Sequence, residues 1–469
     1  MVNGLPSLFD GEQQMYSKLL TKVIYPLLQV KYPMLHSTIK NLETLNKTQW
    51  LPLSEIERFQ YQRLQRLLTY AYENIPYYHT VFKTRGLHPT DIKNSADLQK
   101  LPILTKDIIR KQLSELIPKN SQKNKIFPTA TGGSTGEPMK FFIDDNWNAW
   151  NMAAAYRQWS WAGYSVGDKL IYLWSSPKDI SFQKELKNKF LNTFHRTMYL
   201  NALQLTEETM DSYIEIIKKF KPRVVNAYAS AIYLLAQYMQ KKGITGVGPK
   251  VILTSCEMLF PFQRELIEKT FGCSVYDYYS GRDTTFHAAE CSQHNGYHMT
   301  IENAVVEFLK QNEPVSPGET GKLIITDLEN YAMPFIRYEI GDLGQMSDER
   351  CPCGRNLPLL KEIAGRIRDV IVTNEGKYLT GAFISTLFYD DNGLTKGIKQ
   401  YQFIQKTKEH AILKIVKAED FSEGELNKIL DKIHEQCGEM KIDVEFVDSI
   451  LPTRSGKYRP ILSEVKMDF

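Results

Sequence analysis

The sequence predicts an α/β protein with a large N-terminal domain that contains parallel sheets and a small α+β domain at its C-terminal end. Between residues 167 and 279, short apolar runs alternate with amphipathic segments, a pattern typical of parallel strands joined by helices. After about residue 368 the pattern changes to a hairpin, a helix and a final strand. We therefore expect domains over residues 1–367 and 368–469, and a chain of 469 residues is long enough for separate cores.

Composition and charge exclude several classes of protein. The 58 Lys and Arg residues nearly balance the 54 Asp and Glu residues, and a net charge of +4 provides no electrostatic basis for binding nucleic acid. No apolar run approaches 18 residues, which argues against a spanning helix, and the N-terminal residues lack the pattern of a secretory signal. Six cysteines are too few for a disulfide scaffold, so we expect a cytoplasmic protein with reduced thiols.

The elements of the large domain follow in order along the chain. The first hundred residues have the periodicity of peripheral helices, most clearly over residues 53–79, where Pro76 ends the pattern. Four buried strands come next, and the helix after the second of them stops at Gly243. In open α/β sheets ligands bind where strands end, so chemistry should be sought after these strands. The predicted strands cover residues 167–174, 221–228, 249–259 and 273–279.

The small domain is predicted from three segments. Residues 401–418 contain two alternating runs around a polar turn, which indicates a hairpin. Residues 422–438 form an amphipathic helix pattern, with Ser422 as the N-cap and Glu425 three residues further on. Residues 441–451 predict the last strand.

A loop rich in glycine and hydroxyl groups, TATGGSTGEP, occupies residues 129–138. Its three glycines and four hydroxyl side chains supply backbone N–H and O–H donors that can wrap a polyphosphate. It is not a Walker A sequence, because no Gly-Lys-Ser/Thr follows at the required spacing. The alternative is an ordinary turn, which the density of hydroxyl groups disfavours.

Two further motifs carry a carboxylate next to a predicted strand or turn. Residues 278–284, YYSGRDT, directly follow a strand, and Asp283 is placed where a carboxylate can hold nucleotide-bound Mg²⁺. Residues 334–344, PFIRYEIGDLG, put Asp342 in a glycine-flanked turn, where it can accept hydrogen bonds from two ribose hydroxyls. Taken singly, each motif is also compatible with a solvated turn.

The last two motifs lie at the domain change and near the end of the chain. Residues 365–369, GRIRD, coincide with the change of sequence pattern. Residues 451–459, LPTRSGKYR, carry Lys457 on a Gly-Ser loop, from which it could be delivered to an anion formed elsewhere. Each of these motifs could again be a solvated turn if it stood alone.

Together and in this order, the motifs resemble those of the adenylate-forming superfamily of acyl-CoA synthetases, in particular its phenylacetate–CoA ligase and capsule-biosynthesis branch. The resemblance runs from about residue 90 to the end. It implies a large domain and a small mobile lid that turns about the GR-x-x-D segment. The implied roles are ATP phosphate binding for Thr131, Gly132, Gly133, Ser134, Thr135 and Gly136, adenine stacking for Tyr279, ribose binding for Asp342 and Arg366, the hinge for Arg368 and catalysis of adenylation for Lys457.

Asp283 departs from the family pattern that the resemblance implies. It stands where the family usually has the Mg²⁺-binding glutamate, and Ser280 stands where glycine is usual. The shorter side chain changes the metal geometry but retains the carboxylate.

A second group of residues predicts a metal site. The segment from Cys291 to His298 and the later CPCG turn supply three thiols and an imidazole, a set that suits tetrahedral Zn²⁺. The relatives implied by the resemblance carry a similar set. We expect Cys291, His298, Cys351 and Cys353 to bind a structural zinc ion, with His294 as the reserve ligand, the alternative being buried unpaired cysteines.

The resemblance implies an ATP-dependent carboxylate ligase that uses Mg²⁺ and CoA, with an aryl or arylacetic acid as substrate. The same adenylating residues could pass the acyl group to an amine, a hydroxyl or a carrier-protein thiol. A hypothesis of another class is a non-catalytic, zinc-stabilised nucleotide-binding scaffold, which the Asp283 departure favours and Lys457 disfavours. A homodimer is left open.

The acid itself is not identified by the sequence, because pocket residues in this family are scattered along the large domain. Several aromatic residues could line an aryl pocket, although their helical spacing is more typical of core packing. These residues are Trp147, Trp150, Tyr156, Trp159, Trp161 and Tyr228.

Overall fold

The computed structural model describes most of the chain. The described residues are 15–27, 33–119, 126–131, 139–174, 196–202, 205–366, 371–375, 378–379, 384, 387–390, 393–395, 397–451 and 459–465.

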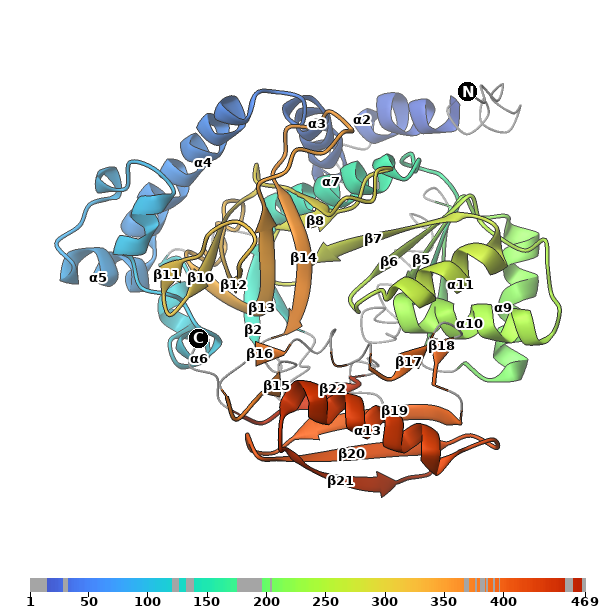
Figure 1. Ribbon diagram of the computed structural model, residues 1–469. Coiled ribbons are helices and arrows are strands. Elements are labelled where there is room, and N and C mark those ends of the chain that lie inside the picture. Colours follow the sequence, from blue (N-terminus) through green and yellow to red (C-terminus); the bar gives the residue numbers. More distant parts are fainter. Residues whose placement is uncertain are drawn as a thin grey trace.

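The N-terminal part is helical, as the sequence predicted, and lies along one side of the molecule (Figure 1). Pro76 separates the two main helices: the first ends at Asn74, and the proline, which has no N–H to donate, becomes the first residue of the next. The elements are η1 Leu20–Ile24, α2 Tyr25–Leu27, α3 Pro33–Thr48, α4 Leu53–Asn74, α5 Pro76–Thr84, η2 Pro89–Asp91, η3 Ala96–Lys100, α6 Lys106–Lys111 and η4 Leu113–Leu116.

An antiparallel hairpin follows, formed by β1 (Ile126–Ala130) and β2 (Lys140–Asp144). The hairpin leads into α7 (Asp145–Trp161), whose N-cap Asp144 accepts a hydrogen bond from the backbone N–H of Trp147. Eleven of the 17 residues of α7 are buried, because the helix passes between α3 and the large sheet. The buried residues of α7 therefore lie on several faces of the helix.

The five strands β7-β6-β5-β3-β4 form a parallel sheet, in which all four strands predicted from the sequence are present. Strands β5 and β6 are buried at every position, because helices cover both faces. The bounds are β3 Leu170–Trp174, β4 Thr197–Asn201, α9 Glu207–Phe220, β5 Val224–Tyr228, α10 Ala229–Lys241, β6 Val251–Ser255, α11 Pro261–Phe271 and β7 Ser274–Ser280.

The large sheet is mixed, not wholly parallel, because seven further strands continue it through antiparallel pairs. The sequence pattern did not predict this antiparallel half. The order of the twelve strands is β11-β10-β12-β13-β14-β9-β8-β7-β6-β5-β3-β4. The additional strands are β8 His287–Ala289, β9 Tyr297–Met299, β10 Ala304–Lys310, β11 Glu313–Pro314, β12 Thr320–Asp327, β13 Tyr338–Ser347 and β14 Leu359–Arg366.

The C-terminal part contains a separate four-stranded sheet of order β21-β20-β19-β22, covered by α13. The predicted hairpin and helix are present, and the strand predicted after the helix is β21, although a further strand, β22, follows it. Buried residues from Ile371 to Ile461 form a core of their own. The exact boundary at 367/368 stays a prediction. The elements are β15 Ile371–Val372, β16 Tyr378–Leu379, β17 Tyr389–Asp390, β18 Gly393–Leu394, β19 Ile398–Gln405, β20 His410–Lys417, α13 Glu423–Cys437, β21 Lys441–Phe446 and β22 Ile461–Ser463.

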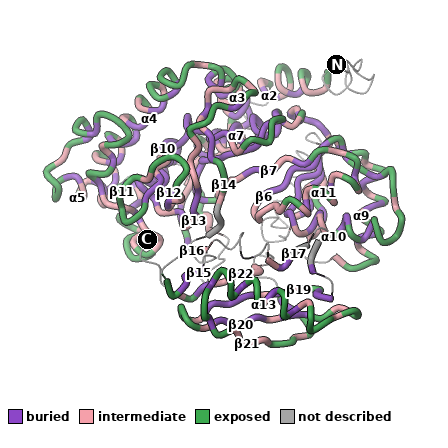
Figure 2. Tube along the Cα trace, in the orientation of Figure 1, coloured by how far each residue is buried: buried purple, intermediate pink, exposed green. Residues whose placement is uncertain are grey.

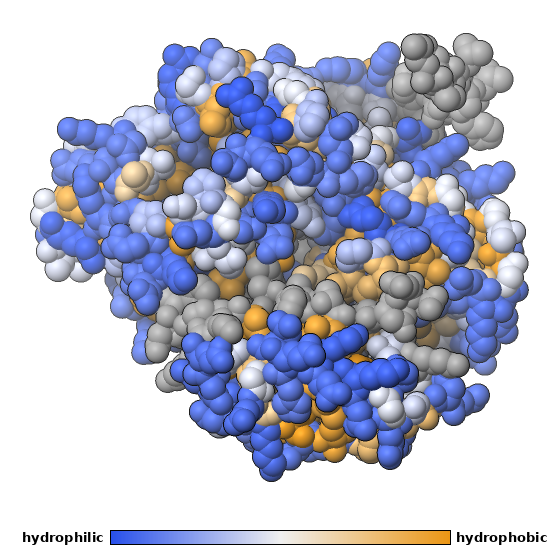
Figure 3. All heavy atoms as spheres, viewed as in Figure 1, coloured by the Kyte–Doolittle hydropathy of each residue, from blue (hydrophilic) through white to orange (hydrophobic). Residues whose placement is uncertain are grey.

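Burial follows the layers of the fold. The central strands are buried, while the outward faces of the covering helices are exposed (Figure 2). Hydrophilic side chains dominate the face of the molecule seen in Figure 3. None of the helices in the described ranges combines the length and the hydropathy that a bilayer span requires.

Candidate functional site

Asp283 lies in the turn after β7, the strand at which the sheet changes from parallel to antiparallel. Its side chain is buried, and its Oδ2 accepts a 2.7 Å hydrogen bond from the hydroxyl of Tyr338, the first residue of β13. Burial raises the pKa of Asp283, while the charge of Lys106 and the hydrogen bond from Tyr338 act in the opposite direction. The carboxylate of Asp283 is therefore desolvated, and the charge of Lys106 and the hydroxyl of Tyr338 stabilise its ionised form.

Gly281 provides the space that this carboxylate needs. A Cβ atom at Gly281 would lie 2.9 Å from Oδ1 of Asp283, closer than real Cβ contacts. The family pattern implied glycine at the position of Ser280, and here the close approach occurs one residue later. Gly281, one position after Ser280, thus lies beside the Asp283 carboxylate.

Asp342 lies on β13, four residues after Tyr338. Its Oδ2 accepts a 2.6 Å hydrogen bond from the hydroxyl of Tyr279, the residue before the last of β7. The register of β13 and β14 pairs Asp342 with Arg366. The backbones of Asp342 and Arg366, the two residues predicted to bind ribose, are therefore adjacent. Asp342 is also hydrogen-bonded directly to Tyr279.

The glycine- and hydroxyl-rich loop is described only at its start. Thr131 follows β1, where its backbone N–H donates to the carbonyl of Met139 and its Oγ1 accepts from the N–H of Met139, both at 3.0 Å. These two bonds close the β1–β2 hairpin, so the loop connects two paired strands. The remaining predicted loop residues, Gly132, Gly133, Ser134, Thr135 and Gly136, lie outside the described residues, as do Arg368 and Lys457.

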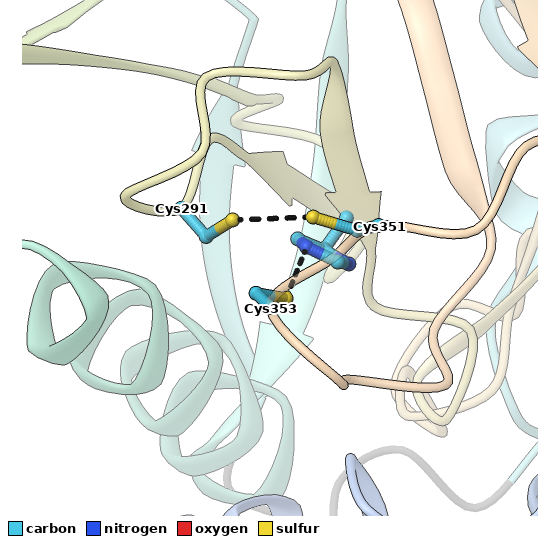
Figure 4. Close-up of side chains that lie close together, drawn as sticks. Cys291, Cys351 and Cys353 are labelled. Atoms are coloured by element: carbon cyan, nitrogen blue, oxygen red, sulfur yellow. Dashed lines mark hydrogen bonds between the residues drawn. The ribbon is translucent and has the colours of Figure 1, made fainter.

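The four predicted zinc ligands lie together. Cys291 follows β8, His298 is on β9, and Cys351 and Cys353 are in the turn between β13 and β14. One ligand atom from each lies within 4.8 Å of the others. The Sγ atoms of Cys291 and Cys351 are 3.5 Å apart, and Sγ of Cys353 is 3.3 Å from Nε2 of His298. Figure 4 shows the three thiols pointing toward one another.

The local electrostatics suit a metal ligand set. Burial, assisted by the charge of Arg355, lowers the pKa of His298 to about 4, which keeps the imidazole neutral with a lone pair to share. Burial raises the pKa of Cys291 to about 12, so a thiolate there requires a cation. His294, the reserve ligand, instead contacts Glu290 through Nδ1 at 3.1 Å and does not join the cluster.

The turn that carries two of the cysteines contacts the turn after α3 and the end of α7. Oε1 of Gln49 accepts 3.0 Å hydrogen bonds from Nε of Arg355 and from Nε1 of Trp161. The guanidinium of Arg355 also lies 5.0 Å from the ring of Trp50 and 4.9 Å from that of Trp161. Residues far apart in the chain thus fix the position of the CPCG turn.

The aromatic residues considered for an aryl pocket are buried, which agrees with the expectation that they belong to the core. Nε1 of Trp147 donates a 2.9 Å hydrogen bond to Asp327, and the rings of Tyr156 and Trp159 meet edge to face at 5.7 Å. Tyr228, at the carboxyl end of β5, lies 4.9 Å from the ring of Trp174 at the end of β3.

Sequence reasoning missed two residues of the Asp283 site, Tyr338 and Lys106. Tyr338 lies on the same strand as Asp342, but the strand is irregular between Glu339 and Leu343, so alternation along the strand would not have placed the two side chains together. Lys106 carried no signal, since its Nζ donates to the carbonyl of Ile340, 234 residues later in the chain.

Comparisons with known proteins agree with this architecture. Residues 371–464 match the family model of the CapK C-terminal domain. Protein CapK of Staphylococcus aureus is 26% identical over 88% of this chain and 90% of its own length. Phenylacetate–coenzyme A ligase of Escherichia coli is 25% identical over 68% of this chain and 73% of its own. The corresponding Thermus thermophilus ligase is 22% identical over 69% and 73%.

Solved structures have the same fold. A 2-hydroxyisobutyryl-CoA ligase in the postadenylation state, in complex with 2-HIB-AMP, superposes with a TM-score of 0.71 at 22% identity. That match covers 89% of this chain and 92% of the ligase. The same enzyme with 2-HIB-AMP and CoA in the thioesterification state gives a TM-score of 0.59 at 21% identity, covering 89% and 91%.

Proposed function

This chain is a homologue of CapK and of the phenylacetate–CoA ligases with the adenylate-forming ligase fold, and on that premise we propose that it activates a carboxylic acid with ATP. The acid would form an acyl-adenylate, pyrophosphate would leave, and the acyl group would pass to CoA. We propose an aryl or arylacetic acid as the substrate class, because the phenylacetate–CoA ligases are among the relatives.

The strongest support for this proposal is the placement of two carboxylates. Asp283, which follows β7, accepts a hydrogen bond from the hydroxyl of Tyr338 on β13, and Asp342 on β13 accepts one from the hydroxyl of Tyr279 on β7. Both carboxylates therefore lie near the carboxyl end of β7. Ligand sites of α/β sheets occur at this edge. A nucleotide site needs one carboxylate for a divalent cation and one for ribose hydroxyls, and this pair supplies both.

The proposed chemistry requires charge stabilisation. A carboxylate oxygen of the acid attacks the α-phosphorus of ATP, the bond to the bridging oxygen breaks, and pyrophosphate leaves with its electron pair. Magnesium held by Asp283 would screen the phosphate charges, and the carboxylate fits this role because Oδ2 is oriented by Tyr338. Asp342 would accept hydrogen bonds from the ribose hydroxyls. Lys457 would stabilise the charge that develops at the α-phosphate.

We also propose that Cys291, His298, Cys351 and Cys353 bind a structural zinc ion. Two sulfurs on one tetrahedral zinc, at about 2.3 Å each, lie roughly 3.8 Å apart. The observed 3.5 Å between Cys291 and Cys351 is close to that separation. A complete set of four protein ligands leaves no position for substrate, so the ion would stabilise the fold and would not take part in the reaction.

A different acceptor is the second candidate, because the match to CapK extends over more of the chain than the matches to the phenylacetate–CoA ligases. Residues 371–464 match the CapK model, and CapK covers 88% of this chain, whereas the phenylacetate–CoA ligases cover 68–69%. The acyl group could then pass to an amine, a hydroxyl or a carrier-protein thiol. The alternative from another class is a zinc-stabilised nucleotide-binding scaffold without catalysis.

Pyrophosphate release separates these hypotheses. The protein is mixed with ATP, Mg²⁺ and a panel of aliphatic, aryl and arylacetic acids, with Lys457→Ala as the inactive control. Release with an aryl or arylacetic acid supports the proposed function, and comparison of CoA with amines and alcohols then identifies the acceptor. Nucleotide binding without release for any acid would favour the scaffold.

A further inference from the structure

The segment that precedes α6 is hydrogen-bonded to the start of β13. The N–H of Leu104 donates to the carbonyl of Arg337 at 2.8 Å, and the N–H of Glu339 donates to the carbonyl of Leu104 at 3.0 Å. The side chain of Arg337 adds further hydrogen bonds. Its Nη1 donates to the carbonyl of Leu101 at 2.6 Å, while its Nε and Nη2 donate to the carboxylate of Glu307. These bonds bring α6 against the strand that carries Tyr338 and Asp342.

The first residue of α6, Lys106, therefore reaches the site of the two carboxylates. Its Nζ donates a 2.6 Å hydrogen bond to the carbonyl of Ile340 and lies 6.0 Å from the ring centre of Tyr338. Its charge also acts on Asp283, which it helps to keep ionised against burial. The ammonium thus lies next to the position where the proposed function places Mg²⁺ and phosphate.

Gly341 lies next to this ammonium, one residue before Asp342. A Cβ atom at Gly341 would lie 3.4 Å from Nζ of Lys106, and the φ angle of +94° favours glycine there. An ammonium has three N–H donors, and the carbonyl of Ile340 takes one. The side chain of Lys106 is half-buried, and its Nζ is positioned by the carbonyl of Ile340. The other N–H groups of the ammonium can donate hydrogen bonds to an anion.

We propose that Lys106 is a nucleotide-contacting residue whose ammonium binds a phosphate group of ATP beside Asp283. The inference rests on the proposed function and adds a second cation to it. Lys457 belongs to the predicted lid, whereas Lys106 belongs to the large domain together with both carboxylates. Lys106 therefore remains in place when the lid turns, and it contacts the phosphate of the acyl-adenylate as well as that of ATP.

Calorimetric titration with ATP, AMP and adenosine tests this assignment without depending on turnover. Lys106→Met removes the charge while keeping most of the length of the side chain, and Lys106→Arg restores the charge. Lys111, exposed on the same helix, gives the matched control Lys111→Met. We expect Lys106→Met to weaken ATP binding roughly 10- to 100-fold and adenosine binding less than about twofold, with Lys106→Arg recovering part of the ATP affinity.

The three nucleotides distinguish phosphate contact from a structural role. Equal loss of ATP and adenosine affinity in Lys106→Met would mean that Lys106 only holds β13 through Ile340, and unchanged ATP affinity would also overturn the assignment. Thermal melting of each variant checks that the fold is intact, and Lys106→Gln, which also removes the charge, replaces Lys106→Met if that variant does not fold. If the unaltered protein binds ATP and Lys106→Met retains that affinity, only this inference fails. If the unaltered protein binds no adenine nucleotide, the proposed function fails with it.

Discussion

The hydroxyl of Tyr338 donates a 2.7 Å hydrogen bond to Oδ2 of Asp283, and both side chains are buried. The two residues are 55 positions apart and come from different halves of the large sheet. Because a buried carboxylate is costly to keep ionised, this donor decides both the orientation of Asp283 and the pH at which it can bind a cation.

In the pH profile of pyrophosphate exchange, Tyr338→Phe should move the loss of activity at low pH to a higher pH. Burial raises the pKa of Asp283, and the hydrogen bond from Tyr338 lowers it, so removal of the hydroxyl raises it further. If ionised Asp283 holds Mg²⁺, pyrophosphate exchange at limiting Mg²⁺ should then fail at a higher pH than in the unaltered protein. The control is Tyr238→Phe, which removes a 2.8 Å hydrogen bond to Asp211 on the helices away from the site. Profiles that coincide would remove Asp283 from the Mg²⁺ site.

Asp342→Ala should weaken ATP binding by removing the proposed acceptor of the ribose hydroxyls. Hydrogen bonds to a charged acceptor contribute about 1.5–3 kcal/mol, which corresponds to roughly a 10- to 100-fold change in affinity. Calorimetric titration with ATP measures the change, and Asp348→Ala, at an exposed position just after β13, is the control. A folded Asp342→Ala variant with normal ATP affinity would contradict the assignment.

Freshly purified protein should contain about one zinc ion per chain. Replacement of Cys351 or Cys353 by serine should remove the ion and lower the unfolding temperature, while the surviving folded fraction keeps its chemistry. Elemental analysis and thermal melting measure the two effects, with Cys273→Ser as a control outside the cluster. Zinc-free protein, or zinc content unaffected by Cys351→Ser, would rule out the metal site.

Lys457→Ala should act on one half-reaction only. Loss of an electrostatic stabiliser of this kind typically slows adenylation about 10²–10³-fold. Transfer of the acyl group from a presynthesised acyl-adenylate should be nearly unchanged, because the lid has turned and Lys457 has left the acyl-phosphate. Equal slowing of both steps would contradict domain alternation, and no slowing of either would make Lys457 an ordinary surface lysine.

Arg157→Met should destabilise the fold strongly. The Arg157–Glu302 ion pair is fully buried, with 2.6 Å between Nη1 and Oε1, and it ties α7 to the turn before β10. Removal of one partner leaves an uncompensated buried charge, at a cost of about 3–5 kcal/mol. Urea unfolding measures the loss, and the double variant Arg157→Met/Glu302→Leu should recover part of it. A single variant as stable as the unaltered protein would contradict this account.

Local sequence was sufficient for much of the architecture. The runs LIYLW, VVNAY and VILTS are apolar because their strands are buried on both faces, and each is a strand of the parallel sheet. The same holds for the break at Pro76 and for the hairpin that forms β19 and β20. The antiparallel half of the sheet was not anticipated, because strands β8 and β9 have only three residues each and give no clear periodicity.

The sequence by itself determined which residue types were present for chemistry: Asp283 after a strand, Asp342 between glycines, and three thiols with two imidazoles. Only the tertiary structure decided how they combine. It placed His298 and not His294 among the thiols, because β9 pairs with both β8 and β14. It also joined Tyr338 and Lys106 to Asp283. Such contacts depend on strand register and on loops that close over many residues, and no local pattern of apolar and polar residues encodes the partner of a given side chain.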